Sequence, residues 1–369
     1  MRHFTHIADL GVDGVAAVLE RALEIKSSGG LRAAGKPGAR DGAATQRMLF
    51  NARVLAMLFF NPSLRTRVSF ETAMLRNGGS AVVLSAGQDT WKLEDRPGAV
   101  MDGDRPEHIR DAIPVLCTYI DALAVRCFAG IADRDADEQD TLLRTIRELA
   151  TVPVISMESA REHPCQGLAD MLTVLEVGPA AGRSTSAAQR AAPPLQGRRL
   201  TLTWAPHIKP LPLAVPHSFL LTAAACGADI TVAHPPGFEL HSTVLAEAAR
   251  YAQQSGRTIN FTHEQHAACA GAEVVCAKSW SPAEVGNATA LLAQHRDWLM
   301  DLPQLTGSGD FSRRTNPARF MHCLPVRRNV EVSDAVLDSP LSLTVPEAHN
   351  RYFIQVAALD LLLNGGSDA

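Results

Sequence analysis

With 369 residues, the chain is long enough for two domains of ordinary size. Its formal net charge of -4 gives no general attraction for nucleic acid or an anionic membrane surface, so any basic surface must be local. Seven cysteines without paired CxxC spacing favour a reducing compartment over a disulfide framework or a zinc site. We expect a cytoplasmic protein, because residues 1–10 lack the apolar core of a signal peptide and no apolar run is long enough to span a membrane.

Apolar runs that read as strands alternate with helix-like patterns along the chain. The expected strands are 54–60, 81–84, 122–126 and 152–157, followed by 200–205, 229–233, 258–261, 273–277 and 319–323. Such alternation is typical of parallel sheets covered by helices. The sequence therefore predicts an α/β fold of two domains, each a mostly parallel sheet flanked by helices. Segments 33–44 and 177–199 lack apolar periodicity and are expected to be loops, the second a flexible insertion.

The first motif is a tight turn, FFNPSLRTR at residues 59–67, between the first apolar run and a helical pattern over 68–77. At a helix N-terminus, free backbone N–H groups and the helix dipole favour an oxyanion such as phosphate. Arg65 and Arg67 can add bidentate hydrogen bonds to it. Taken alone, the motif could equally be a solvated turn whose arginines pair with carboxylates such as Glu71.

Further polar segments follow the later strands. Arg126 ends the run from 120, and His163-Pro-Cys-Gln166 lies between a strand and a helical pattern. His163 and Gln166 are neutral donors suited to polarising a carbonyl group. The segment MHCLPVRR at 321–328 follows the last strand, and a C-terminal helix from about 347 carries Arg351. Each segment alone has an ordinary structural explanation, because a single histidine or cysteine near a strand end is usually structural.

Together, in this order and spacing, the segments resemble the transcarbamylases, and within them the ornithine transcarbamylase branch, over nearly the whole chain. The resemblance implies a carbamoyl-phosphate-binding domain at 1–155, completed by helix 347–369, and an acceptor-binding domain at 156–346. It assigns carbamoyl phosphate binding to Ser63, Leu64, Arg65, Thr66, Trp91, Arg126, His163, Gln166, Cys323, Leu324 and Arg351. The residues expected to be catalytic are Arg65, Arg126, His163, Gln166 and Cys323, the last through its backbone carbonyl.

The resemblance also implies direct transfer of the carbamoyl group, with no covalent enzyme intermediate and no cofactor. The family is built on trimers, so we expect a homotrimer in which Trp91 reaches the neighbouring subunit's site. No metal is expected either: 102–104 and 263–266 contain ligand types, but neither has a zinc or calcium spacing.

The identity of the amine that accepts the carbamoyl group can be inferred from a difference in sequence. Common ornithine transcarbamylases carry an Asp-x-x-x-Ser-Met-Gly loop that is not found here. The stretches 202–207 and 276–280 instead resemble the branch that acts on N-acylated ornithine. Acylation removes the α-ammonium charge and leaves an anionic end. Lys278, Arg327 and His207 are therefore expected to hold the α-carboxylate and acyl group, and Glu158 to attract the δ-ammonium group.

The acyl group is indicated by residues 102–108, DGDRPEH. Enzymes for acetylornithine carry an acidic residue in this stretch, whereas those for succinylornithine carry proline, as at Pro106. Loss of a carboxylate removes repulsion against a second substrate carboxylate and frees space. N-succinyl-L-ornithine is therefore favoured over N-acetyl-L-ornithine, although Pro106 can also simply shape the loop ahead of a helix at 109–116.

Two further classes are less favoured than an N-acylornithine enzyme. A binding protein without catalytic activity would be expected to lose Arg65, Arg126 or His163, and this chain has all three. A nicotinamide-dependent dehydrogenase would share the alternating strands and helices, but no Gly-x-Gly-x-x-Gly follows a strand. Activity on free ornithine is disfavoured by the missing Ser-Met-Gly loop.

Overall fold

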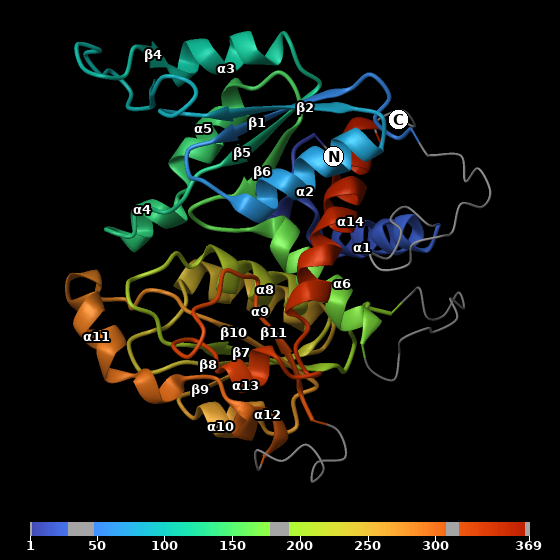
Figure 1. The fold of residues 1–369 in the computed structure, drawn as a ribbon, viewed down its shortest axis with the longest axis vertical. Helices are drawn as coiled ribbons and strands as arrows, with labels where there is room; N and C mark the ends of the chain where they lie inside the picture. Colours follow the sequence, from blue (N-terminus) through green and yellow to red (C-terminus); the bar gives the residue numbers. More distant parts are fainter. Residues whose placement is uncertain (1, 29–47, 178–191, 308–316, 366–369) are drawn as a thin grey trace.

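The computed structural model describes residues 2–28, 48–177, 192–307 and 317–365. It shows two α/β domains stacked along the long axis of the molecule (Figure 1). The loop predicted at 33–44 and most of the insertion predicted at 177–199 lie outside the described residues.

The first domain is built on a four-stranded parallel sheet in the order β2-β1-β5-β6. Its strands are β1 (Val54–Phe59), β2 (Ser80–Ser85), β5 (Ala122–Arg126) and β6 (Val154–Glu158). A two-stranded ladder adds β3 (Leu93–Glu94) and β4 (Glu107–His108). The helices are η1 (Ile7–Asp9), α1 (Gly11–Ser27), α2 (Leu64–Arg76), α3 (Ile109–Cys117), α4 (Arg134–Glu138) and α5 (Thr141–Leu149). β5 and β6 are buried along their length, and β1 from its second residue on, because helices cover both faces of the sheet.

The second domain is built on a five-stranded parallel sheet in the order β11-β10-β7-β8-β9. Its strands are β7 (Arg199–Trp204), β8 (Asp229–Ala233), β9 (Ile259–Thr262), β10 (Val274–Lys278) and β11 (Arg319–Met321). Its helices are α8 (Ala214–Ala225), α9 (Ser242–Gln254), α10 (Gln265–Cys269), η2 (Val285–Asn287), α11 (Ala288–Gln294), η3 (Arg296–Trp298), α12 (Leu302–Thr306) and α13 (Asp334–Leu337). The fold class predicted from the sequence is confirmed, and all nine predicted strands match observed ones within two residues at each end.

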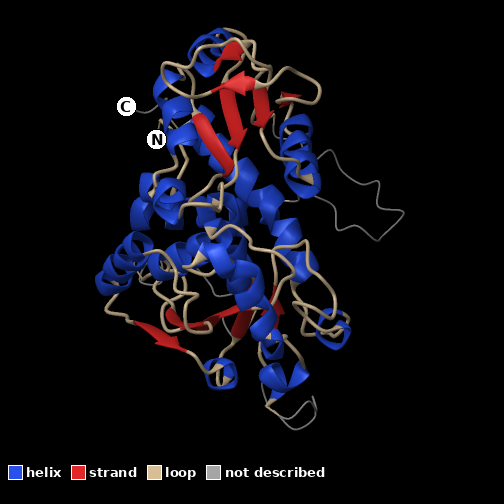
Figure 2. Ribbon diagram, turned by 90° about the vertical axis from the view of Figure 1, so that its left-hand side faces the viewer, coloured by secondary structure: helices blue, strands red, loops and turns tan. Residues whose placement is uncertain are grey.

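Two long helices join the domains. α6 (Pro164–Glu176) packs against α8 of the second domain and against α14 (Thr344–Leu363), which in turn packs against α1 and α2 of the first domain. Figure 2 shows this helical layer between the two sheets. Because α6 contacts both halves, the fold does not single out one residue as the boundary, and the division at 155/156 stays a prediction.

A close approach of backbones fixes the contact between α6 and α8. Residues 164–174 of α6 are all buried. At Gly167, an added Cβ would lie 2.5 Å from Thr222 Oγ1 and 2.6 Å from the backbone oxygen of Ser218. Glycine is therefore needed here for space.

Replacement of Gly167 by alanine should destabilise the protein. Alanine favours a helix more than glycine by about 1 kcal/mol, but overpacking against a backbone oxygen should outweigh this and give a net loss of about 1–3 kcal/mol. The measurement is the urea-unfolding midpoint of Gly167→Ala. Gly286→Ala is the matched control, because a Cβ at Gly286 meets nothing within 4 Å. An unchanged or higher midpoint for Gly167→Ala would contradict the close-packing argument.

Candidate active site between the two domains

The order of the first sheet brings its polar strand ends together. Phe59 at the end of β1 pairs with Arg126 at the end of β5, and Arg126 pairs with Glu158 at the end of β6. α2 begins five residues after β1. β1 lies between β2 and β5, so this edge is a switch point of the strand order, where α/β proteins commonly bind ligands.

The first turn of α2 is capped by Ser63, whose Oγ accepts a hydrogen bond from the Thr66 N–H at 3.3 Å. The remaining N–H groups of a first helical turn have no intrahelical partner and favour an anion. Thr66 Oγ1 accepts a hydrogen bond from Arg351 Nη2 at 2.5 Å, which brings an arginine from α14 to this turn. The predicted turn thus gains a cation from a helix about 285 residues away in the chain.

The two arginines of the turn have different surroundings. Arg65 is half-buried, whereas Arg67 is exposed and lies 3.7 Å from Glu71 on the surface of α2. The alternative interpretation from the sequence, in which these arginines pair with Glu71, therefore holds for Arg67. Of the two arginines expected to make bidentate hydrogen bonds to an oxyanion, only Arg65 is therefore in a position to do so.

Three guanidinium groups and one imidazole form a cationic cluster, defined here as Arg65, Arg126, Arg351 and His163. The Nε atoms of the three arginines are buried and have no hydrogen-bond partner among the described residues. Burial and then repulsion by Arg65 and Arg126 lower the pKa of Arg351. A phosphate dianion bound here would accept hydrogen bonds from the unpaired arginine donors. Its negative charge would also offset the repulsion among the guanidinium groups.

His163 lies at the N-cap of α6, and its backbone N–H donates to Ser218 Oγ at 2.7 Å. Its Nε2 atom is 3.7 Å from Glu158 Oε2, and its buried Nδ1 has no partner in the described structure. Burial, followed by the charges of Arg351, Arg126 and Arg65, lowers the pKa of His163 well below its usual value. The imidazole is therefore neutral at physiological pH, as expected for a neutral hydrogen-bond donor.

Gln166 lies one turn further along α6. Its Nε2 atom donates to Asp170 Oδ1 at 2.7 Å and to Glu347 Oε1 at 3.0 Å, while its buried Oε1 has no partner in the described structure. The sequence analysis gave no role to Asp170 or Glu347. The sequence did contain one sign of a role for Asp170, because it is the single acidic residue in the otherwise mostly apolar helical pattern of 164–175.

The segment after β11 reaches the same place from the second domain. His322 is fully buried, and its backbone N–H donates to Glu347 Oε2 at 2.9 Å. Leu324 has a φ of 55°, an unusual conformation for a residue with a side chain, and such residues cluster at functional sites. Burial raises the pKa of the Cys323 thiol to about 12. The thiol is therefore protonated and not a nucleophile, which fits the expected use of its backbone carbonyl.

The residues predicted to hold the acceptor also lie together. Arg327 Nε donates to His207 Nε2 at 3.0 Å. Lys278 ends β10 and is buried; burial disfavours its charge, but negative groups that include Glu331 and Glu158 raise its pKa overall. Glu158 accepts a hydrogen bond from Arg126 Nη1 at 2.6 Å. The two domains thus place cations on both sides of one carboxylate.

Trp91 and Pro106 are not part of this constellation. Both are exposed, and Trp91 Nε1 donates to Glu107 Oε2 at 2.5 Å, beside Pro106. Figure 1 shows β4, which starts at Glu107, at the outer end of the first domain, away from the second domain. Arg105 pairs with Asp95 at 2.9 Å, so its charge is balanced locally. In a single subunit this segment does not contribute to the cleft.

A hollow of about 260 Å³ lies next to the first turn of α2. It is lined by Phe59, Phe60, Asn61, Pro62, Ser63, Leu64, Arg67, Val68, Ser85, Ala86 and Gln88. Two of the lining side chains, Leu64 and Val68, are 77% and 54% exposed, and Leu75 near the end of α2 is 73% exposed. An apolar stripe of this kind is typical of a contact with another protein surface.

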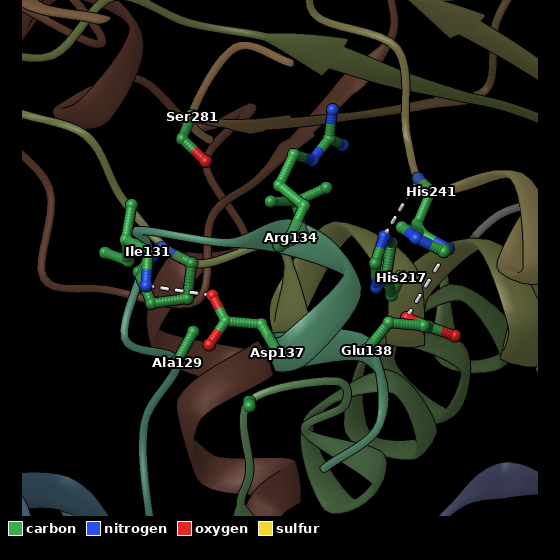
Figure 3. A pocket seen from close by; sticks show the side chains of 11 residues that line it. Ala129, Ile131, Arg134, Asp137, Glu138, His217, His241 and Ser281 are labelled. Carbon is green, nitrogen blue, oxygen red and sulfur yellow. Dashed lines mark hydrogen bonds and ion pairs between the residues drawn. The ribbon is translucent and has the colours of Figure 1, made fainter. Parts of the chain in front are cut away.

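A second, smaller cavity of about 20 Å³ lies where α4 meets the second domain (Figure 3). It is lined by Ala129, Ile131, Arg134, Asp137, Glu138, Ala160, Pro212, Leu213, His217, His241 and Ser281. Polar contacts cross the domains here: Arg134 Nη2 donates to the Glu239 carbonyl at 2.7 Å, and His241 Nε2 lies 3.0 Å from Asp135 Oδ1. None of the residues predicted to bind a substrate lines this cavity, which is a domain contact.

In the part of the chain that the structure describes, no group of three or more His, Cys, Asp or Glu side chains is arranged to hold a metal ion. Among the described helices, none combines the length and apolar character needed to cross a bilayer.

Comparisons with known proteins agree with this geometry. Residues 2–176 match the model of the aspartate/ornithine carbamoyltransferase carbamoyl-P binding domain, and residues 214–362 match that of the Asp/Orn binding domain. An N-succinylornithine carbamoyltransferase from Bacteroides thetaiotaomicron is 39% identical, over 85% of this chain and 88% of that protein. An N-acetylornithine carbamoyltransferase from Xanthomonas campestris pv. campestris is 37% identical, over 88% and 94%.

Solved structures with the same fold include a glutamate-to-proline mutant of N-acetyl-L-ornithine transcarbamylase complexed with carbamyl phosphate and N-succinyl-L-norvaline. It superposes with a TM-score of 0.84 at 35% identity, over 98% of this chain and 100% of that one.

Inorganic phosphate should stabilise the folded protein through the cationic cluster. A ligand present at about 100 times its Kd adds about 2.7 kcal/mol to the free energy of unfolding. The measurement is the thermal midpoint with phosphate or chloride at equal ionic strength. Arg65→Gln should abolish most of the phosphate-dependent shift, whereas the control Arg67→Gln, which removes the surface partner of Glu71, should keep it. Equal shifts in the two variants would show that phosphate does not bind at this cluster.

Proposed function

The chain belongs to the aspartate/ornithine carbamoyltransferase family, and on that premise we propose that it carbamoylates an N-acylated ornithine. The reaction moves the carbamoyl group of carbamoyl phosphate to the δ-amine of N-succinyl-L-ornithine, giving N-succinyl-L-citrulline and phosphate in arginine biosynthesis. The observation that carries the proposal is the cationic cluster of unpaired buried donors, which converges with Lys278 of the second domain on one carboxylate, Glu158.

Carbamoyl phosphate would bind with its phosphate at the first turn of α2. Ser63, the Leu64 backbone and Thr66 surround this position, and Arg65 and Arg126 supply charged donors. Arg351 supports the turn through Thr66. The carbonyl oxygen would accept hydrogen bonds from Arg126 and the neutral His163, and the NH2 group would donate to Gln166 Oε1 and the carbonyls of Cys323 and Leu324.

The chemistry is direct attack of the neutral δ-amine on the carbamoyl carbon. The C–N bond forms while the carbonyl oxygen becomes an oxyanion, which His163 and Arg126 stabilise. Collapse of this intermediate breaks the C–O bond to phosphate, and the departing phosphate can take the proton released by the amine. Most of the rate then comes from alignment of the two substrates and charge stabilisation. The raised pKa of the Cys323 thiol disfavours this side chain as a nucleophile, which is consistent with direct transfer.

The acceptor would bind between the domains with its anionic end toward the second. Lys278, Arg327 and His207 form a basic surface there, suited to an α-carboxylate and an acyl group. Glu158 lies between this surface and the cationic cluster, where it can attract the δ-ammonium group before deprotonation.

For the acyl group, the relatives named above differ too little in identity to choose between succinyl and acetyl. Pro106 supports the succinyl compound, because a glutamate there would repel a second carboxylate. The solved glutamate-to-proline mutant of an acetylornithine enzyme was complexed with an N-succinyl ligand, which supports the same physical argument. N-acetyl-L-ornithine is the second candidate, favoured by relatives of that name that match over most of their length.

Because Pro106 and Trp91 lie away from their own cleft, we further propose a homotrimer in which they reach a neighbouring subunit's site. The outward apolar residues Leu64, Val68 and Leu75 give α2 a surface for a second copy. The hollow beside Ser63 has room for part of a neighbouring subunit's segment around Trp91, whose side chain is 60% exposed while its Nε1 donates to Glu107 of the same subunit.

We also propose a cytoplasmic location. The seven cysteines support it, because none of them forms a disulfide in the described structure.

The function is tested by carbamoyl-phosphate-dependent product formation with ornithine, N-acetylornithine and N-succinylornithine offered separately at equal concentration. N-succinylornithine should give the highest kcat/KM. Pro106→Glu should reduce the succinyl-to-acetyl ratio by tenfold or more, corresponding to about 1.4 kcal/mol or more of like-charge repulsion. Pro106→Ala is the control that changes the loop without adding charge. Turnover of free ornithine alone would overturn the N-acyl assignment, and an unchanged ratio in Pro106→Glu would overturn the role of Pro106.

Shared sites are tested by co-expressing two variants that are each inactive, Trp91→Ala and Arg65→Gln. If each site uses Trp91 from a neighbour, random trimers regain about a quarter of wild-type activity, because that fraction of sites combines two intact residues. The assembly mass from light scattering is measured alongside. If Trp91 serves its own subunit, the mixed trimers stay inactive.

A further inference from the structure

Two carboxyl groups are buried together where α6 crosses α14. Asp170 is 1% exposed and Glu347 is fully buried, and their partner is the amide of Gln166. Glu347 also accepts the His322 N–H through its other oxygen. Buried carboxyl groups are costly unless they are hydrogen-bonded, paired or neutral, and such groups cluster at functional sites.

The pair fixes which end of the Gln166 amide faces the cleft. An amide NH2 has two donors, and both are used, at 2.7 Å to Asp170 Oδ1 and 3.0 Å to Glu347 Oε1. A rotated amide would put Oε1 against the two carboxyl groups, lose both of these hydrogen bonds and regain at most one, from the proton that the pair retains. Oε1 therefore points the other way, where it is buried and has no partner in the described structure.

The charge on the pair fits this arrangement. Burial, and then the Asp170 charge, raises the pKa of Glu347 well above its usual value, and burial raises the pKa of Asp170 to about 7. Arg351 acts in the opposite direction on both groups. The two carboxyl groups thus retain a proton between them at neutral pH, which lets them lie against one amide without strong repulsion.

We propose that Asp170 and Glu347 are positioning residues that make the site select a carbamoyl group: they hold Gln166 so that Oε1 accepts from the ligand's NH2. A methyl group in place of that NH2, as in acetyl phosphate, would leave Oε1 without a donor. Glu347 also accepts a hydrogen bond from the His322 N–H. It therefore also positions the segment whose Cys323 and Leu324 carbonyls would accept from the same NH2 group. The proposal rests on the proposed function and adds the origin of its selectivity for the donor substrate.

The test uses two stable ligands of equal shape, phosphonoacetamide, which has the NH2 group, and acetonylphosphonate, which has a methyl group in its place. Their Kd values are measured by calorimetry on the intact protein without acceptor. Wild type should prefer phosphonoacetamide. Asp170→Leu should reduce the preference about tenfold by weakening phosphonoacetamide alone, because a buried acceptor then loses its alignment.

Three further variants separate positioning from general loosening of the helix pair. Glu347→Gln can turn its own NH2 toward Gln166 and should also reduce the preference, which keeps the test available if Asp170→Leu does not fold. Gln166→Met removes the acceptor itself, and adding Asp170→Leu to it should cause no further loss of preference. Thr173→Val is the matched control: it removes the 2.9 Å hydrogen bond from Asn350 Nδ2 between the same two helices and should keep the preference.

The outcomes are distinguishable. Binding of neither ligand by wild type would overturn the proposed carbamoyl phosphate site. A wild-type preference that persists in both Asp170→Leu and Glu347→Gln would overturn the positioning role and leave the proposed function intact. Equal weakening of both ligands in these variants would also overturn it, because that pattern indicates structural damage.

Discussion

The repulsion among guanidinium groups crowded at the start of α2 is the constraint on which the site depends. Arg65, Arg126 and Arg351 come from α2, β5 and α14; Arg126 and Arg351 are buried and Arg65 is half-buried, and the Nε atom of each has no partner in the described structure. Two contacts hold them, Arg126 to Glu158 and Arg351 to Thr66. The fold therefore holds these positive charges close together at the start of α2, where a phosphate dianion would balance them. Burial, and then the same charges, lowers the pKa of His163 well below its usual value, so the surroundings that bind an anion also favour a neutral hydrogen-bond donor.

The helical layer between the sheets couples the two substrates. α6 carries His163 and Gln166, and α14 carries Glu347 and Arg351, so groups for the phosphate and for the carbamoyl amide lie on the same helix pair. Hydrogen bonds from Asn350 of α14 to Thr173 and Glu176 of α6 tie this pair together, and close packing at Gly167 ties α6 to α8 of the second domain. Lys278 and Arg327 approach from the second sheet. A change in the angle between the domains would therefore move the phosphate-binding turn of α2 relative to Lys278 and Arg327.

The fold could be predicted from the sequence because parallel strands buried on both faces appear as continuous apolar runs. The turn at 63–66 could also be predicted, since its residue types have a direct physical meaning at a helix N-terminus. The interaction partners of the individual site residues could not be predicted from the sequence. Nothing in the spacing indicates that Glu347 meets Gln166 across 181 positions, or that Arg67 faces solvent while Arg65 does not. The ladder of β3 and β4 was also missed, because two-residue strands have no periodicity.

The position of α14 in the chain has a consequence for biosynthesis. This helix follows all other described elements in the sequence, yet it packs against α1, the first of the long helices, and brings Arg351 to the turn after β1. During translation, the apolar faces of α1 and α2 that α14 covers stay uncovered until α14 itself has left the ribosome. Until then the growing polypeptide resembles a folding intermediate with exposed apolar surface, and the rate at which α14 emerges sets how long that surface is open to aggregation.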